Sequence, residues 1–175
     1  AGLVALQEWR QMLHSRKSVR FEDGVKFAAL EPCPYPELDV EIVFDNPVIG
    51  RQRTHMALSG MRFKGELARA RTFGFAHEVE YMRRNGLALG GSLDNAVVVD
   101  GDSVVNPEGL RYADEFVRHK ALDAVGDLYL AGAPIVGRYV GHQAGHKLNN
   151  SVLRALFADP DAYEWVDHQQ TRHAA

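Results

Sequence analysis

Apolar residues recur along this chain at two spacings, one typical of helices and the other of strands. Helical spacing predicts four helices, at residues 1–14, 61–85, about 111–130 and 146 to about 158. In the second of them a glycine stands between two aromatic residues, Phe73-Gly74-Phe75, and we expect the helix to be interrupted there. Helices are therefore the longest predicted elements.

Alternating apolar and polar residues predict short strands between these helices. Asp23-Gly24 supplies a turn that tolerates a left-handed backbone, so residues 19–27 are expected to form a hairpin. Further strands are expected at residues 40–44, 96–99, 104–105 and 134–140.

The predicted elements do not repeat in a regular strand–helix–strand order, which favours the α+β class. We predict a two-layer sandwich in which a small mixed sheet packs on helices, with a short inserted subdomain that contains strands. At 175 residues the chain has the length of one domain with a sizeable core. We assign that domain to residues 1–166 and expect a frayed polar tail at residues 167–175.

Composition and charge narrow the possible classes of function. Hydrophobic residues make up 46% of the chain and charged residues 25%, which is ordinary for a globular protein. The formal net charge of −3 gives no electrostatic reason to expect a nucleic-acid partner. Cys33 is the only cysteine, so no intrachain disulfide can form and a cytosolic setting fits. The longest weakly polar run, residues 128–137, is too short to span a bilayer, and no signal peptide is evident.

One face of the third predicted helix carries the most informative candidate chemistry. His119 and Asp123 are four positions apart, so their side chains leave the helix on one side, about a turn apart. This spacing lets one helix offer a nitrogen and an oxygen ligand to a single metal ion. On a helical wheel Lys120, Asp127 and Phe116 share this side. The spacing alone also fits a solvated face with a His–Asp pair, and a catalytic zinc ion needs a third protein ligand.

Three other segments contain residues that could form a site. His146 begins the last predicted helix, where a histidine is well placed to act as an acid or to bind phosphate, but it also fits a plain loop histidine. Thr72 is placed to be an exposed hydrogen-bond donor, although the aromatic residues that follow it are typical of a core. The run His77-Glu78-Val79-Glu80-Tyr81 begins like the HExxH helix of zinc proteases, but Tyr81 occupies the second ligand position. We reject that third interpretation.

Six segments together resemble one family closely. In chain order they are Ala70-Arg-Thr-Phe-Gly-Phe75, Gly86-Leu-Ala-Leu-Gly-Gly-Ser92, Asn106-Pro-Glu-Gly-Leu-Arg-Tyr112, Asp114-Glu-Phe-Val-Arg-His-Lys120, Leu122-Asp-Ala-Val-Gly-Asp127 and Gly145-His-Lys-Leu-Asn-Asn150. Their order and spacing resemble UDP-3-O-acyl-N-acetylglucosamine deacetylase, the zinc amidase of the lipid A pathway. The match runs from about residue 71 to residue 156, and a weaker pattern reaches back to the N-terminus. Such a long ordered match is far more specific than one His–Asp spacing, and it favours the metal interpretation.

The resemblance implies a role for each residue of the catalytic centre. His119 and Asp123 would be two of three ligands to a zinc ion, Zn²⁺. His146, in its protonated form, would stabilise the oxyanion and protonate the leaving amine, while Asp127 would hold it in orientation. Thr72 would donate a hydrogen bond to the same oxyanion.

The resemblance also implies substrate contacts. Lys120 would meet polar groups of the substrate, and Phe44 matches the position that stacks near the uridine. The residues that match the family's hydrophobic passage for the acyl chain are Phe73, Leu87, Gly91, Ser92, Ala96 and Val98.

The implied activity is zinc-dependent hydrolysis of the N-acetyl amide of UDP-3-O-acyl-N-acetylglucosamine, in the cytoplasm of a Gram-negative-type bacterium. In this family another zinc ligand and a general-base glutamate lie together in a preceding domain, and no such motif occurs here. We therefore interpret residues 1–166 as the second, C-terminal domain of a two-domain deacetylase. The N-terminal half would be supplied on the same or on a separate polypeptide, and this chain alone would be inactive.

Two positions depart from the family pattern. Gln143 stands where the family usually has a lysine near the diphosphate, and Asn46 replaces the usual histidine before Pro47. Both bear on nucleotide affinity rather than on zinc chemistry. The competing interpretations are a non-catalytic remnant that binds a nucleotide-sugar or a partner protein, and an unrelated α+β scaffold whose His–Asp face is ordinary surface.

Overall fold

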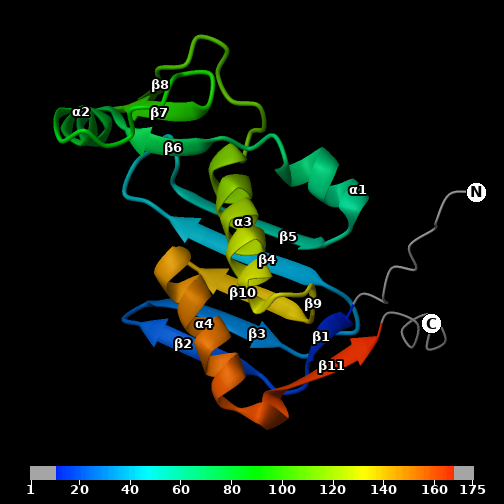
Figure 1. Cartoon of the computed structure of the whole chain (residues 1–175). Helices are drawn as coiled ribbons and strands as arrows, with labels where there is room; N and C mark the ends of the chain where they lie inside the picture. Colours follow the sequence, from blue (N-terminus) through cyan, green and yellow to red (C-terminus); the bar gives the residue numbers. More distant parts are fainter. Residues whose placement is uncertain (1–10, 168–175) are drawn as a thin grey trace, which may run out of the picture.

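The computed structural model describes residues 11–167 and has the predicted α+β architecture (Figure 1). Its main body is a five-stranded mixed sheet in which β10 is parallel to β4 and antiparallel to β3. In spatial order the strands are β2 (Val19–Asp23), β3 (Lys26–Glu31), β10 (Arg138–His142), β4 (Glu37–Val43) and β5 (Arg51–Ala57). The predicted hairpin at residues 19–27 is thus confirmed as β2 and β3, and the predicted strand at 40–44 corresponds to β4.

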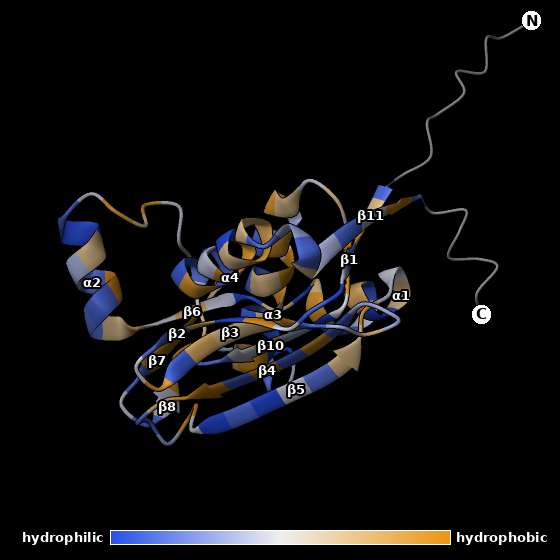
Figure 2. Ribbon diagram, turned by 90° about the horizontal axis from the view of Figure 1, so that it is seen from below, coloured by the Kyte–Doolittle hydropathy of each residue, from blue (hydrophilic) through white to orange (hydrophobic). Residues whose placement is uncertain are grey.

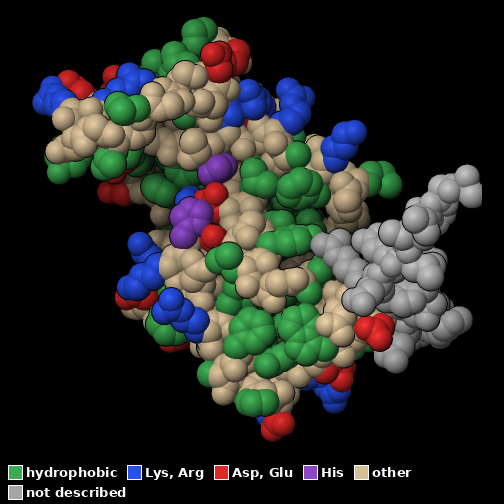
Figure 3. All heavy atoms as spheres, in the orientation of Figure 1, with side chains coloured by type: hydrophobic (Ala, Val, Ile, Leu, Met, Phe, Trp, Pro, Cys, Tyr) green, Lys and Arg blue, Asp and Glu red, His purple; other side chains and the backbone are tan. Residues whose placement is uncertain are grey.

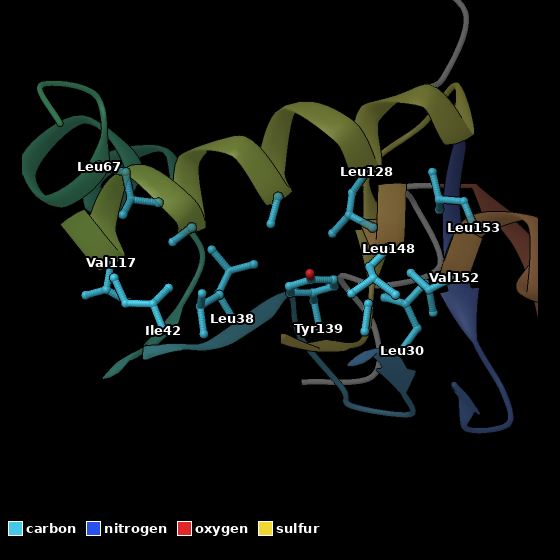
Figure 4. Packing of buried hydrophobic residues seen from close by; sticks show 14 of the residues in the cluster. Leu30, Leu38, Ile42, Leu67, Val117, Leu128, Tyr139, Leu148, Val152 and Leu153 are labelled. Carbon is cyan, nitrogen blue, oxygen red and sulfur yellow. The ribbon is translucent and has the colours of Figure 1, made fainter. Parts of the chain in front are cut away.

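Two helices, α3 (Glu115–Leu128) and α4 (His146–Ala158), cover one face of this sheet. Both were predicted; α4 begins at the expected residue, and α3 begins four residues later than expected. The core lies between the layers, where Val117 and Leu128 of α3 face Leu38 and Tyr139 of the sheet (Figure 4). The other face of the sheet is charged, and β5 forms its hydrophilic edge (Figure 2).

A second, short sheet lies beside this body, and it shows that the helix predicted for residues 11–14 is wrong. It consists of β11 (Tyr163–Asp167), β1 (Gln11–Ser15) and β9 (Ile135–Val136). Residues 11–14 are therefore strand rather than helix; the rest of the predicted helix, residues 1–10, lies outside the described residues. The backbone of β1 pairs with strands from the other end of the chain, and such partners override a short local spacing of leucines. Of the predicted tail, Asp167 ends β11, and residues 168–175 also lie outside the described part.

The predicted single strand at 134–140 is divided between two sheets. β9 ends at Val136 and β10 starts at Arg138, so the chain changes sheet at Gly137. A Cβ at Gly137 would come within 2.9 Å of the Ser15 Cβ and 3.0 Å of the Glu31 carbonyl oxygen. Only glycine lets the three strands approach this closely.

An inserted subdomain stands at one end of the body, as predicted (Figure 1). Its strands are β6 (Thr72–Phe75), β7 (Ala96–Asp100) and β8 (Ser103–Val104), and α2 (Ala76–Arg84) packs on them. The expected strands at 96–99 and 104–105 are confirmed as β7 and β8, with β8 ending one residue early.

The interrupted helix predicted at 61–85 is confirmed in part: residues 61–67 and 76–84 are helical, and the segment between them is not. The chain forms one short turn, α1 (Gly60–Arg62), a π-helical turn at Phe63–Leu67, and then β6 and α2. The expected break at Phe73-Gly74-Phe75 is a strand, because β6 pairs in parallel with β7 across about 20 intervening residues. β5 was not predicted, because its outward side chains are polar and only Thr54 and Met56 are buried.

Phe116 was predicted on the polar side of α3, and the structure buries it completely. Its ring packs edge-on against Phe73 at 5.0 Å between centroids, which closes the core under the inserted subdomain. We expect Phe116→Ala to lower the free energy of unfolding by about 3–5 kcal/mol, because it leaves a large cavity. Urea unfolding would measure this change. Tyr81→Ala, at a side chain that is 69% exposed, is the matched control and should cost less than about 0.5 kcal/mol.

Across residues 11–167, no helix combines the length and the apolar character needed to cross a bilayer.

Candidate active site

The polar face of α3 brings the two predicted metal ligands into contact. His119 Nε2 lies 3.3 Å from Asp123 Oδ1, and both side chains are about 85% buried, with 15% and 14% exposure. Lys120 Nζ donates to the other carboxylate oxygen, Asp123 Oδ2, at 3.1 Å. Figure 3 shows histidine and acidic side chains gathered on this face, below the inserted subdomain.

The orientation of His119 is compatible with metal binding. Its Nδ1 is 3.3 Å from the carbonyl oxygen of Ala70, to which it donates in the tautomer that this contact favours. Nε2 then carries no proton and faces Asp123. Burial lowers the pKa of His119, while the negative charge of Asp123 opposes this shift, so the net effect favours the neutral imidazole. A neutral imidazole and a carboxylate are ligand types that zinc accepts.

The two residues fit zinc in donor type and spacing but do not complete a site. A catalytic zinc ion takes three protein ligands. Within residues 11–167, no group of three or more His, Cys, Asp or Glu side chains is arranged to hold a metal ion.

His146 and Asp127 form a second pair at the start of α4. His146 Nδ1 lies 2.8 Å from Asp127 Oδ2, and the histidine side chain is 66% exposed. Asn149 Nδ2 donates to the same carboxylate oxygen at 2.8 Å, and the Tyr139 hydroxyl donates to Asn149 Oδ1. Asp127 is therefore fixed by α4, and it directs one histidine nitrogen inward and the other toward solvent. The structure thus brings together residues 19 positions apart in the sequence.

Two residues close to Thr72 in the sequence, Ala70 and Phe73, contact His119. Ala70 accepts the His119 hydrogen bond, and the ring of Phe73 packs on the imidazole at 6.3 Å between centroids. Thr72 itself is exposed at the start of β6. Lys120 Nζ lies 5.7 Å from the centre of the Phe73 ring.

The predicted substrate-contact residues fall into two groups. Phe44 is half-buried and packs against Phe73 at 5.6 Å and Phe75 at 6.3 Å, so these aromatic rings join β4 to the inserted subdomain. Phe73 lies on the inner face of β6, opposite Val97 in the register.

Of the other residues predicted for the acyl passage, Ala96 and Val98 lie on the face of β7 away from Phe73. Ala96 and Val98 alternate with the buried Val97 and Val99, and Ala96 is the register partner of Thr72. Leu87, Gly91 and Ser92 belong to the segment between α2 and β7, and Leu87 is 58% exposed. Thr72, Ala96 and Val98 thus share one face of this small sheet.

The two positions that depart from the family pattern have clear local roles. The Asn46 side chain accepts from the backbone N–H of Val48 and donates to the Gly101 carbonyl oxygen at 2.8 Å, which ties the β4–β5 turn to the subdomain. Gln143 adopts a φ of 48°, and its backbone N–H donates to the Glu41 carbonyl oxygen at 2.7 Å.

A separate apolar cavity of about 570 Å³ opens on another side of α3. Leu58 and Phe63 line it from one wall, and Leu122 and Val125 of α3 from another. None of the side chains predicted for metal binding, catalysis or substrate contact lines this cavity. The candidate chemistry therefore lies on the polar face of α3, outside this cavity.

Sequence reasoning did not identify one charged group of this region, Arg71 with Glu115. Glu115 is fully buried and Arg71 is 4% exposed. Arg71 and Glu115 each lie in one of the family-like segments, which marked them as charged residues of interest. The spacing of these segments does not show that the two residues, 44 positions apart, pair with each other.

Comparison with known proteins agrees with the motifs. A family model described as UDP-3-O-acyl N-acetylglycosamine deacetylase matches residues 1–158. The UDP-3-O-acyl-N-acetylglucosamine deacetylase of Acidithiobacillus ferrooxidans is 49% identical over 174 residues, which cover 98% of this chain and 57% of the relative. The proteins of the same name from Phenylobacterium zucineum (53% identical; 93% of this chain, 56% of the relative) and Neisseria gonorrhoeae (48%; 95% and 55%) are similar. The chain thus spans little more than half the length of these relatives.

Proposed function

Because the chain belongs to the UDP-3-O-acyl N-acetylglycosamine deacetylase family, we propose that it forms the second half of a zinc-dependent deacetylase of lipid A biosynthesis. Its reaction is hydrolysis of the N-acetyl amide of UDP-3-O-acyl-N-acetylglucosamine, which yields acetate and the free amine. The observation that carries the proposal is the row His119, Asp123 and Asp127 on one face of α3, with His146 at its end. The whole enzyme acts in the bacterial cytoplasm.

His119, through Nε2, and Asp123, through its carboxylate, would hold the zinc ion. When bound, zinc supplies Lewis acidity toward water and toward the amide carbonyl. The Ala70 carbonyl keeps the His119 proton on Nδ1 and leaves Nε2 as the donor atom. Lys120 balances the negative charge of Asp123 and lies close enough to the site to bind polar groups of the substrate.

His146 handles the proton in this proposal. Asp127 accepts from Nδ1 and stabilises the imidazolium, so Nε2 can carry a proton toward the substrate. That proton stabilises the developing oxyanion and then passes to the leaving nitrogen. Thr72, next to the residues that touch His119, donates its hydroxyl hydrogen to the same oxyanion.

The inserted subdomain binds the rest of the substrate. Ala96 continues from Thr72 across the β6–β7 register, so an acyl chain that starts near the reacting amide would meet Ala96 and Val98 first. Leu87, Gly91 and Ser92, in the segment between α2 and β7, would extend this surface, while Phe73 on the opposite face of β6 packs against His119. Phe44 stacks near the uridine.

The remaining zinc ligand and the general base come from an N-terminal half, on the same or on a separate polypeptide. We expect this chain alone to bind zinc weakly, because two protein ligands leave the site incomplete. Metal analysis after dialysis would measure the zinc that remains. Tight stoichiometric zinc on the 175-residue chain would contradict the incomplete site.

A fusion tests the function directly. It joins the portion of the Acidithiobacillus ferrooxidans relative that this chain does not span to residues 1–175. We expect the fusion to release acetate from UDP-3-O-acyl-N-acetylglucosamine, and the chain alone to release none. A folded fusion that retains zinc and binds the substrate without turnover would overturn the proposal in favour of a non-catalytic remnant.

A further inference from the structure

A single peptide group, the one that joins Ala70 to Arg71, is held at both ends by α3. Its N–H donates to Glu115 Oε1 at 2.9 Å, and its carbonyl oxygen accepts from His119 Nδ1 at 3.3 Å. The N–H and C=O of a trans peptide point in opposite directions, and Glu115 and His119 are one helical turn apart on the same side. The peptide group therefore spans one turn of α3, and rotating it would break both contacts.

Glu115 anchors this peptide group. Its carboxylate is fully buried and also accepts from Arg71 Nε at 3.0 Å, Arg71 Nη2 at 3.1 Å and the Arg111 backbone N–H at 2.6 Å. Burial acts to raise the pKa of Glu115, but the donors from Arg71 and Arg111 outweigh it and hold the pKa below its usual value. A buried carboxylate with four donors is a rigid anchor, because moving it would leave the buried negative charge of Glu115 without its donors.

Arg71 is held just as firmly from the other side. Its Nη2 donates to the Gly109 carbonyl oxygen at 2.7 Å, and its Nη1 pairs with Glu108. Ala70 and Arg71 are thus fixed against α3 immediately before β6 begins at Thr72. Thr72 follows directly, so its place relative to His119 depends on the same peptide group.

We propose that Glu115 is a positioning residue: through the Ala70–Arg71 peptide group it sets the tautomer of His119 and the place of Thr72. With the Ala70 carbonyl pointing at Nδ1, His119 keeps its proton there and presents a bare Nε2. The consequence for catalysis rests on the function proposed above. The tautomer does not, because it is a property of this chain by itself.

The tautomer is measured by two-bond imidazole ¹H–¹⁵N correlation NMR of the ¹⁵N-labelled 175-residue chain without metal, at a pH where His119 is neutral. The signal of His119 is assigned by its loss in His119→Gln. We expect the Nδ1–H form in the wild-type chain and a mixture of both tautomers in Glu115→Gln. Arg71→Lys should keep the Nδ1–H form, because the backbone N–H that Glu115 holds is still present.

The fusion shows whether the same anchor supports catalysis. We expect Glu115→Gln to lower kcat about 10- to 100-fold and zinc affinity by about tenfold, while KM changes less than about threefold. Asp114→Asn is the matched control: it also converts a carboxylate to an amide, one residue earlier, and breaks the ion pair with Arg118 Nε (2.5 Å). It should leave kcat within about twofold.

Several results would overturn the proposal. They are an Nε2–H tautomer in the wild-type chain, an unchanged tautomer in a folded Glu115→Gln chain, or equal losses of kcat in Glu115→Gln and Asp114→Asn. If Glu115→Gln does not fold, the wild-type and Arg71→Lys spectra decide, since a tautomer mixture in either contradicts the peptide anchor. A fusion without any deacetylation would refute the proposed function, and the spectra of the chain would still test the anchor.

Discussion

Replacing His119 by alanine in the fusion is expected to lower kcat/KM for deacetylation by about 10³-fold or more. The physical reason is that a metal ion acting as Lewis acid contributes several kcal/mol of transition-state stabilisation, and each 1.36 kcal/mol is a factor of ten. Asp123→Ala should have an effect of similar size, because it removes the other ligand on the same helix face. Acetate release measures the rate, and metal analysis should show zinc lost in parallel.

The control for this prediction is His55→Ala. His55 also pairs with a carboxylate, its Nε2 lying 2.7 Å from Glu37 Oε1, but it stands on β5 at the charged face of the sheet. Its loss should leave both zinc content and kcat/KM nearly unchanged. If the fusion kept its rate and its zinc after loss of His119 and Asp123, the metal assignment would be wrong, and the solvated-face interpretation of α3 would stand.

His146→Ala is expected to lower kcat about 10²- to 10³-fold, within the range for loss of a positioned general acid. Zinc content should not change, which separates this effect from loss of a metal ligand. Because His146 is exposed, the substitution should also leave the free energy of unfolding nearly unchanged. Single-turnover kinetics with bound zinc would isolate the chemical step.

The residue next to His146 supplies the matched control. Lys147 is exposed on the same turn of α4, and its Nζ pairs with Asp23 Oδ2 at 2.9 Å. Lys147→Ala should retain kcat within about twofold. Equal losses of kcat in both variants would mean that the start of α4 matters through its structure, and the proton-transfer role of His146 would have to be abandoned.

Much of the fold could be predicted because it is locally encoded. The hairpin of β2 and β3 follows from alternation around Asp23-Gly24, and α4 follows from helical spacing that stops before Asp159-Pro160. The errors occur where a partner distant in sequence decides the structure. Residues 11–15 became a strand because β9 and β11 pair with them, and β6 formed inside a helical pattern because β7 pairs with it.

The candidate site also combines features that are encoded locally with features that depend on partners distant in sequence. The alignment of His119 with Asp123 follows from α-helical geometry and was evident from spacing. The contact of His146 with Asp127 joins two helices and was expected only from the family resemblance. The hydrogen bonds between Arg71 and Glu115 were not predicted, because they link the segment just before β6 to the first residue of α3.

By itself, then, the sequence determined the family, the α+β class and the row of ligand-type side chains on α3, since motif order and helical periodicity are properties of the chain. The tertiary structure decided which atoms of these side chains are free to bind a ligand and which are buried or hydrogen-bonded. It buried Phe116, turned the imidazole of His119 so that Nδ1 meets the Ala70 carbonyl, and placed Asp127 against His146. The physical reason is that hydrogen-bond direction and burial depend on groups brought together from separate elements, which no local spacing records.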